Sequence, residues 1–321
     1  MQKRQLGTSE LQVRPVGLGL WAMGGDQWGP TEDAQSLATI SRAVELGIDF
    51  FDTADVYGDG HSEEILGKAM RGRRDRFVVA TKIGWRAFDG TAGRSAYQSP
   101  EAVIADVETN LQRLQTDYID LLQWHVNFRE PGMENFIAGC DRLVEQGKLR
   151  AYGLSTGDPQ YVEDFFTAGS GDSLQLDYSI LNRIPEQRIF PFTSSHGKAT
   201  IIRGGMAMGL LAGKFSPDSR FAQTDFRKAW IEDPEQNRQF LADLETVARL
   251  KEAFPGQNLA QLSLRFLLSN PAVTVIIPGA KRVDQLEANF QAMEFGPLTT
   301  DELHAIDAIV PPGGGRKIWP A

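Results

Sequence analysis

The feature that most constrains this chain is an eightfold alternation of short apolar segments with longer amphipathic ones. Each apolar segment is bounded by Gly, Pro or polar residues, and each amphipathic segment repeats its apolar residues at helical spacing, so the pattern predicts strands that alternate with helices. Such an order favours a parallel sheet with right-handed crossover connections. The apolar segments lie at 16–20, 48–54, 76–84, 117–125, 149–155, 173–179, 199–205 and 273–279.

Eight strand–helix units in 321 residues predict an α/β fold, a single (β/α)8 TIM barrel over residues 1–321, because such barrels take about 250 residues plus insertions. An N-terminal β-hairpin is expected at 3–13, and extra helices in the C-terminal half at 235–254 and 258–270. The composition of 311–321 is typical of a flexible tail. A doubly wound open sheet is the main alternative, but the turn after the first strand lacks the third glycine of G-x-G-x-x-G.

Composition argues against several function classes. A net charge of -9 is unfavourable for polyanion binding, so no nucleic-acid partner is expected. The sequence has no run of about 18 apolar residues and no apolar segment typical of a signal peptide, so neither a membrane partner nor secretion is expected. Cys140 is the only cysteine, which excludes an intrachain disulfide and a cysteine-based zinc site and fits a cytoplasmic location.

Four polar side chains stand at the ends of consecutive predicted strands. They are Asp52 after the second strand, Tyr57 in the following loop, Lys82 after the third strand and His125 after the fourth. In a (β/α)8 barrel the carboxyl ends of the strands converge on one mouth, where active sites lie. The sequence therefore predicts that the four meet there, although each alone also has a structural explanation, such as a turn residue or a buried histidine.

These residue types suit the protonation of a carbonyl oxygen. A nearby Lys82 ammonium favours the phenolate of Tyr57 and lowers its pKa, and Asp52 keeps the buried ammonium charged. His125 can donate a hydrogen bond to the carbonyl oxygen or share the proton. Hydride transfer from a nicotinamide is the reaction that needs such a donor without a nucleophile or a metal, because the alkoxide that forms must be neutralised.

The segments that carry these residues are "GIDFFDTADVYGDGHSEEILGKAM", "VVATKIG", "DYIDLLQWH" and "YGLS". In this order they resemble the aldo-keto reductase superfamily, and the resemblance extends from "QLGTSELQVRPVGLGL" to "QLEANF", over nearly the whole chain. It implies a (β/α)8 oxidoreductase that uses NADPH or NADH. Its catalytic tetrad falls on Asp52, Tyr57, Lys82 and His125, with Tyr57 as the general acid in reduction and Lys82 tuning it.

The same resemblance implies the residues that bind the cofactor near the nicotinamide. Ser155, Thr156 and Gln175 match the residues that hold the carboxamide, with Thr156 in place of the usual Asn. Ser155 and Thr156 also fit a cap for the helix that begins near Asp158. Arg203 replaces an aromatic residue or Ser, and it either stacks on the ring, engages an anionic or polyhydroxylated substrate, or is paired at the rim. The loop that closes over the pyrophosphate supplies Gly204, Gly209, Leu210, Gly213 and Lys214.

By the same resemblance, the loop after the eighth strand binds the adenosine end of the cofactor. The basic Lys281 and Arg282 at a helix start favour the 2′-phosphate of NADPH, with NADH as the second choice, and a solvated helix start is the alternative. Ala288 replaces a common Glu in this motif. The matching residues are Gly279, Lys281, Gln285 and Asn289.

The predicted function is the NADP(H)-dependent reduction of an aldehyde or ketone. The expected partner is thus a small-molecule carbonyl substrate, and we expect it to be polar, such as an aldose. Aromatic rings and arginines around the mouth fit this class. No oligomeric state is predicted. The predicted substrate pocket consists of Trp21, Met23, Trp28, Trp85, Arg86, Trp230 and Trp319.

Two other functions compete with this one. A cofactor-binding regulatory module of the kind found in potassium channel β-subunits could lose the tetrad, whereas all four residues are present here. A barrel lyase or hydrolase would need paired carboxylates or a histidine-rich metal site at the mouth, and the chain has only 4 histidines. No metal ligand is therefore predicted.

Overall fold

The computed structural model describes residues 2–25, 28–29, 31–85, 97–125, 131–223 and 225–318. Strands and helices alternate along the chain, as the sequence predicts. The strands are β1 Arg4–Gln5, β2 Gln12–Val13, β3 Leu18–Gly19, β4 Phe50–Asp52, β5 Val78–Ile83, β6 Ile119–His125, β7 Leu149–Ser155, β8 Ser173–Asp177, β9 Ala199–Arg203 and β10 Val275–Ile276. The α-helices are α1 Asp33–Glu45, α2 His61–Met70, α3 Pro100–Leu114, α4 Met133–Glu145, α5 Pro159–Ala168, α6 Ile189–Ser195, α7 Ala229–Glu232, α8 Pro234–Ala253, α9 Leu259–Ser269, α10 Val283–Phe295 and α11 Thr300–Asp307.

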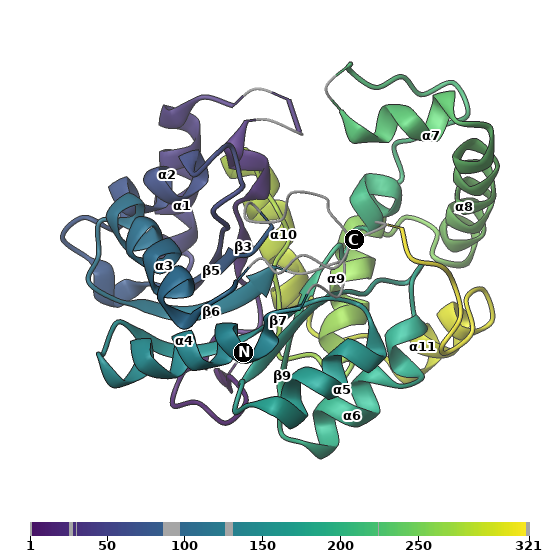
Figure 1. Ribbon diagram of the computed structural model, residues 1–321. Helices are drawn as coiled ribbons and strands as arrows, with labels where there is room; N and C mark the ends of the chain where they lie inside the picture. The colour runs from purple at the N-terminus through teal and green to yellow at the C-terminus, as the bar shows by residue number, and fades with distance from the viewer. Residues whose placement is uncertain are drawn as a thin grey trace.

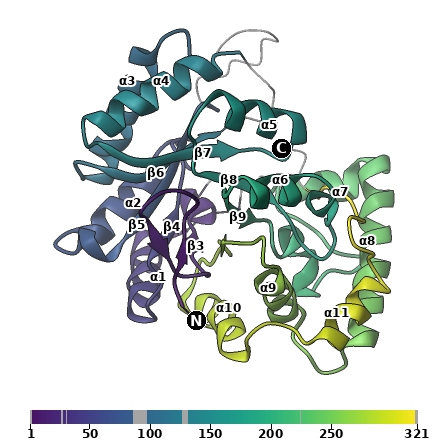
Figure 2. The ribbon, with the colours of Figure 1, turned by 90° about the horizontal axis from the view of Figure 1, so that it is seen from below.

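Strands β3 to β10 form one parallel sheet of 8 strands in chain order. Backbone hydrogen bonds join its two edges, since Gly17 N donates to Ile276 O over 2.8 Å and Ile276 N donates to Pro15 O over 2.9 Å. The helices surround the strands (Figure 1, Figure 2). The sheet is thus closed on itself, and the predicted (β/α)8 barrel is confirmed.

The N-terminal hairpin closes the amino-terminal end of the barrel. β1 and β2 pair antiparallel, as predicted, and Figure 2 shows the purple hairpin in front of the strands. Leu6, Leu11 and Val13 are buried and belong to one apolar cluster with interior residues such as Phe50 and Leu121. Each buried aliphatic side chain of this kind stabilises the fold by about 1.5–3 kcal/mol.

Residues inside the barrel change from apolar to polar along each strand. Side chains alternate between the two faces of a strand, so Phe50 and Asp52 point to the same side, as do Ala80 and Lys82. The first residue of each pair lies in the apolar cluster, and the second is a buried charged residue near the carboxyl end of its strand. The alternation therefore collects polar side chains at the carboxyl-terminal mouth of the barrel.

An insertion between β9 and α9 carries extra helices, as the sequence predicts for the C-terminal half. It contains η5 (Phe226–Lys228), α7 and α8, of which α7 and α8 are drawn in green in Figure 1. Helix α8 begins at Pro234 because the Asp233 carboxylate accepts hydrogen bonds from two backbone N–H groups of its first turn. No helix among the described residues is long and apolar enough to cross a lipid bilayer.

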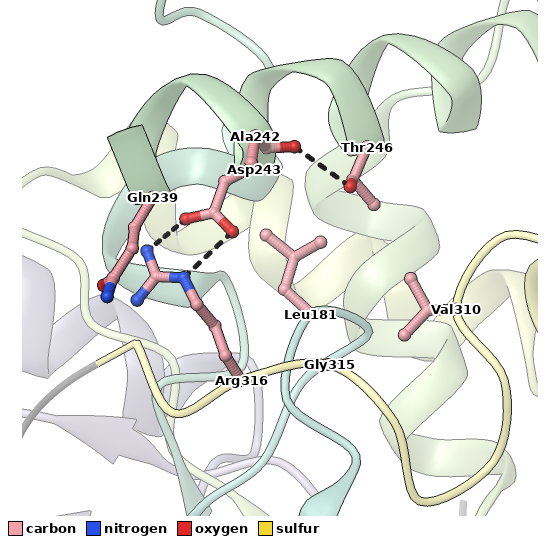
Figure 3. Close-up of a pocket in the computed structure, with 8 residues that line it drawn as sticks. All are labelled: Leu181, Gln239, Ala242, Asp243, Thr246, Val310, Gly315 and Arg316. Carbon is pink, nitrogen blue, oxygen red and sulfur yellow. Dashed lines mark hydrogen bonds and ion pairs between the residues drawn. The ribbon is translucent and has the colours of Figure 1, made fainter. Parts of the chain in front are cut away.

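The segment 311–318 is packed against the barrel. Gly315 pairs with Asn182 in an isolated backbone bridge. The Arg316 guanidinium forms an ion pair with the Asp243 carboxylate of α8 (Figure 3). The prediction of a flexible tail is therefore wrong for 311–318, because partners far away in the sequence hold these residues.

Candidate active site

The structure brings Asp52, Tyr57, Lys82 and His125 together at the mouth of the barrel. Lys82 Nζ donates a hydrogen bond to Asp52 Oδ1 over 2.6 Å and lies 3.3 Å from the hydroxyl oxygen of Tyr57. The Tyr57 and His125 ring centroids are 6.1 Å apart, with the rings at 87° to each other. None of the four residues is more than 8 % exposed. A phenol, an ammonium, a carboxylate and an imidazole thus form one buried group.

The loop that carries Tyr57 is held in place by the backbone. Asp55 N donates to Lys82 O over 3.1 Å, which extends the contact between β4 and β5 beyond the end of β4. Gly58 has a φ of 60°, and a Cβ at this position would lie 2.1 Å from Gly24 O. Only glycine fits there, because a side chain would collide with the backbone. The loop therefore presents Tyr57 in one position relative to Lys82.

The Asp52 carboxylate has two further donors. Gln123 Nε2 donates to Asp52 Oδ2 over 3.2 Å, and Gln175 Nε2 donates to the same oxygen over 2.7 Å. Together with Lys82 they satisfy a carboxylate that is almost fully buried. Gln123 is not among the site residues that the sequence predicts. The available signal was its position two residues before His125, which places both side chains on the same face of β6.

Burial decides the protonation of Tyr57. It raises the pKa of the Tyr57 hydroxyl above its ordinary value, and the Lys82 charge offsets this only in part. The expectation of a lowered pKa for Tyr57 is therefore wrong. The free-energy cost of removing a phenolate from water exceeds the electrostatic stabilisation by one nearby ammonium. The hydroxyl stays protonated at neutral pH, which is the state that a general acid requires.

Burial also acts on Lys82 and His125, with different outcomes. It disfavours the charged form of Lys82, but the Asp52 carboxylate outweighs it, so that the pKa of Lys82 is raised. It lowers the pKa of His125 well below the ordinary value, and the charges of Lys82 and Arg203 act in the same direction. At neutral pH the site thus holds a charged ammonium and a neutral imidazole. This arrangement can protonate an oxygen atom that gains negative charge.

Comparison with known proteins identifies the family to which the chain belongs. The family model "Aldo/keto reductase family" matches residues 15–311. The chain belongs to the aldo/keto reductase family. It is 33% identical over 310 residues, 96% of each chain, to "Uncharacterized oxidoreductase YqkF" of Bacillus subtilis. It superposes on the holo form of aldo-keto reductase AKR11C1 from Bacillus halodurans with a TM-score of 0.79 and 32% identity over 96% of each chain. It is also 30% identical to a probable voltage-gated potassium channel subunit beta of Arabidopsis thaliana, over 94% of this chain and 93% of that one.

In this aldo/keto reductase the residues expected at the nicotinamide lie beside the tetrad. Ser155 and Gln175 are partners in the register of β7 and β8, and both are buried. Gln175 Oε1 is buried and has no hydrogen-bond partner among the described residues, so it is suited to accept a hydrogen bond from a carboxamide N–H. The Thr156 hydroxyl accepts a hydrogen bond from Asp158 N over 3.3 Å, so its side chain shapes the turn before α5.

The residues expected at the pyrophosphate of the reductase cofactor follow β9. Gly204, with a φ of 68°, lies over Asp177, since a Cβ on Gly204 would be 1.8 Å from Asp177 Oδ1. Further along, in and after η4 (Ala207–Ala212), Gly209 and Gly213 also have positive φ values, Leu210 is buried and Lys214 is exposed. Backbone of this kind turns sharply and exposes N–H groups, which suits phosphate oxygens.

The residues expected at the adenosine end gather at the start of α10. Asn289 Nδ2 donates to Gly279 O over 3.2 Å, and Gln285 Oε1 accepts a hydrogen bond from Lys281 N over 2.9 Å. Lys281 Nζ donates to Gly29 O over 2.9 Å. Lys281 therefore connects this end of the site to the loop after β3. Its neighbour Arg282 is instead paired with Asp284 on the surface.

Two of the predicted pocket aromatics lie against the tetrad. Trp21 stacks on Tyr57 with ring centroids 5.9 Å apart, and Trp85 meets His125 edge-on at 4.9 Å. Trp28 lies one ring further out, 5.4 Å from Trp21. These rings form an aromatic wall beside the Tyr57 hydroxyl.

The other predicted pocket residues have different surroundings. Met23 is 1% exposed and is part of the hydrophobic core. Trp230 is buried among Phe221, Phe226 and Phe240, which all come from the insertion. The structure therefore does not bring Trp230 to Tyr57. Arg86 and Trp319 lie outside the described residues.

A buried carboxyl group that is not among the predicted site residues lies close to the tetrad. Glu63, in the first turn of α2, is fully buried and accepts a hydrogen bond of 2.6 Å from the hydroxyl of Thr81, the residue before Lys82. Arg113 Nη1 is 3.4 Å from its other oxygen. Burial nevertheless raises the pKa of Glu63 to about 8.

This raised pKa predicts that stability falls with rising pH. The neutral form of Glu63 stabilises the fold fully below the unfolded-state pKa, and this stabilisation is lost as pH rises toward about 8. Glu63→Gln should remove this contribution to the pH dependence of the unfolding free energy. The difference in unfolding free energy between the variant and the wild type should therefore change by up to about 1.4 kcal/mol per pH unit. Urea denaturation from about pH 5 to about pH 8 measures it. Glu64→Gln, at the exposed next position, is the control, and equal slopes in both variants would contradict the assignment.

Proposed function

We propose that this protein reduces aldehydes or ketones to alcohols with NADPH, and that Tyr57 is the general acid. The observation that carries the proposal is the contact of 3.3 Å between the Tyr57 hydroxyl oxygen and Lys82 Nζ, inside a network in which the Asp52 carboxylate forms an ion pair with the Lys82 ammonium. Trp21 and Trp85 beside this donor offer ring faces that suit either an apolar chain or one face of a polar substrate such as an aldose.

In the proposed reaction the carbonyl oxygen of the substrate accepts hydrogen bonds from Tyr57 and from the neutral His125. A reduced nicotinamide, when bound, supplies the hydride that the carbonyl carbon receives. As negative charge develops on the oxygen, Tyr57 gives up its proton, and the Lys82 ammonium stabilises the phenolate that remains. Asp52 keeps Lys82 charged throughout. Alcohol oxidation uses the same groups in reverse.

Three groups of described residues suit the three parts of a dinucleotide. Ser155 and Gln175 would hold the carboxamide, where the Gln175 Oε1 atom is available as an acceptor. The loop from Gly204 to Lys214 would contact the pyrophosphate, and Lys281 at the start of α10 would contact the 2′-phosphate. A cytoplasmic location stays a prediction from the sequence.

The role proposed for Lys281 can be tested by cofactor preference. Lys281→Met should raise KM for NADPH about tenfold or more and leave KM for NADH nearly unchanged, because one charge-assisted contact to phosphate contributes about 1.5–3 kcal/mol. Lys68→Met is the matched control, since Lys68 is an exposed lysine paired with Asp33 and lies outside the site. Equal losses for both cofactors would show that Lys281 acts only by holding Trp28 and Gly29.

A regulatory module that binds the cofactor without turnover is the second candidate, and the 30% identity to a potassium channel subunit favours considering it. The hydrogen bonds of Lys82 with Asp52 and Tyr57, with the His125 ring beside Tyr57, support the enzyme instead. The test is absorbance at 340 nm with NADPH or NADH and a panel of aldehydes, ketones and aldoses. We expect NADPH consumption that depends on the carbonyl compound. Tight NADPH binding with no consumption for any member of the panel would support the regulatory module.

A further inference from the structure

The Lys82 ammonium has a third acceptor besides Asp52 and Tyr57. Its Nζ donates a hydrogen bond over 2.8 Å to the carbonyl oxygen of Thr53, the residue after Asp52 in the chain. An ammonium carries three N–H donors, so the Asp52 carboxylate, the Thr53 carbonyl and the Tyr57 hydroxyl account for all of them. The position of the Thr53 carbonyl therefore helps to set where Lys82 lies relative to the Tyr57 hydroxyl.

A buried pair of hydroxyl groups fixes Thr53 to helix α2. Thr53 Oγ1 donates to Ser62 Oγ over 2.8 Å, and Ser62 Oγ donates to Leu20 O over 3.1 Å. Thr53 and Ser62 are both 0% exposed. Because side chains alternate along an extended chain, Thr53 points to the side opposite Asp52, away from the barrel interior. A buried hydroxyl that loses its partner is costly, so the pair holds Thr53 in one position.

Ser62 also holds the loop that carries Tyr57. Its backbone N–H donates to Tyr57 O over 3.2 Å. Leu20, whose carbonyl accepts from the Ser62 hydroxyl, is the residue before Trp21, which stacks on the Tyr57 ring. One serine in the first turn of α2 therefore joins the end of β3, the end of β4 and the Tyr57 loop.

We propose that Ser62 is a positioning residue for carbonyl reduction, which holds Lys82 through Thr53 and holds Tyr57 through its own backbone. The inference rests on the proposed reductase function. Ser62 is fully buried, so it acts through these neighbours and not on the substrate. Proton transfer depends on where Lys82 lies relative to Tyr57, and a displacement of about 1 Å in an active site can lower the rate about 10²-fold.

The test removes the hydrogen bond between Thr53 and Ser62 from each side, with the aldehyde that gives the highest turnover as substrate. Ser62→Ala should lower kcat about tenfold and leave KM for NADPH within about twofold of wild type. Thr53→Val keeps the shape of the side chain and should lower kcat about threefold or more, whereas Thr53→Ser keeps the hydroxyl and should retain most of the activity. The double variant, Ser62→Ala with Thr53→Val, should lower kcat no further than Ser62→Ala alone, because both substitutions remove the same bond.

Thr193→Val is the control for the loss of a buried hydroxyl, since Thr193 is 0% exposed and donates to Phe190 O within α6. It should lower the urea midpoint of unfolding without changing kcat. If Ser62→Ala does not fold, the comparison of Thr53→Val with Thr53→Ser decides in the same way.

Three results would overturn the inference alone. They are a wild-type kcat in Ser62→Ala or, where that variant does not fold, in Thr53→Val, losses that multiply in the double variant, and an equal loss of kcat in Thr193→Val. No turnover of any carbonyl compound by the wild-type protein would overturn the inference together with the proposed function.

Discussion

Replacing Tyr57 by phenylalanine is expected to lower kcat for carbonyl reduction by about 10²–10⁴-fold, the range that general acid catalysis contributes. The variant keeps the ring that stacks on Trp21 and loses only the hydroxyl that contacts Lys82, so the fold and the cofactor contacts should be preserved. NADPH binding, followed by fluorescence titration, should therefore change by less than about threefold. A kcat within a few-fold of wild type would show that the proton comes from another group.

The pH profile of the wild type adds a second check on Tyr57. The pKa of Tyr57 is raised by burial, and that of Lys82 is raised by Asp52 against the opposing effect of burial. Neither group should therefore lose its proton between about pH 6 and about pH 9, given ordinary values near 10. Neutral His125 should contribute no transition there either. We expect kcat for reduction to be flat over this range, whereas a Tyr57 with a lowered pKa would give a falling limb.

Replacing Lys82 by methionine should affect both activity and stability. The variant leaves the Asp52 carboxylate buried with two amide donors and no cation, and breaking a buried ion pair in this way costs about 3–5 kcal/mol of unfolding free energy. It also removes the charge that stabilises the Tyr57 phenolate, so kcat should fall by about 10²-fold or more. Urea denaturation and NADPH consumption measure the two effects.

A double variant separates these two consequences. Asp52→Asn combined with Lys82→Met removes both charges, so most of the lost stability should return while kcat stays low. Lys68→Met, which removes an exposed lysine paired with Asp33, should change the unfolding free energy by less than about 0.5 kcal/mol. Recovery of activity in the double variant would contradict the role of Lys82 in tuning Tyr57.

The architecture could be predicted from the sequence because its signals are local. Each barrel strand is a short apolar run, and each helix begins and ends with recognisable residues, as Asp233 does before α8. The segment 311–318 was predicted wrongly for the opposite reason. Its glycines and prolines describe the local chain, whereas the contacts that hold it come from Asn182 and Asp243.

Some features of the candidate site could likewise be predicted from the sequence, and others depend on the folded structure. The order of the strands suffices to place Asp52, Lys82 and His125 at one mouth, since the carboxyl ends of parallel strands meet. The pKa of Tyr57 was not predictable, because it depends on how completely the folded chain excludes water from the hydroxyl. The burial of Trp230 was not predictable either, because its aromatic neighbours come together only when the insertion folds.

Hydride transfer from NADPH to the carbonyl carbon can be followed by deuterium labelling. The experiment uses NADPH that is deuterated at both C4 positions of the dihydronicotinamide ring. This cofactor is mixed with the wild-type protein and an aldehyde that the enzyme turns over, and the alcohol is examined by mass spectrometry. We expect one deuterium per alcohol on the former carbonyl carbon, formed in proportion to the NADPH consumed. In Tyr57→Phe the loss of this product should match the loss of kcat. An alcohol without deuterium, or no alcohol from any aldehyde despite NADPH binding, would contradict the proposed function.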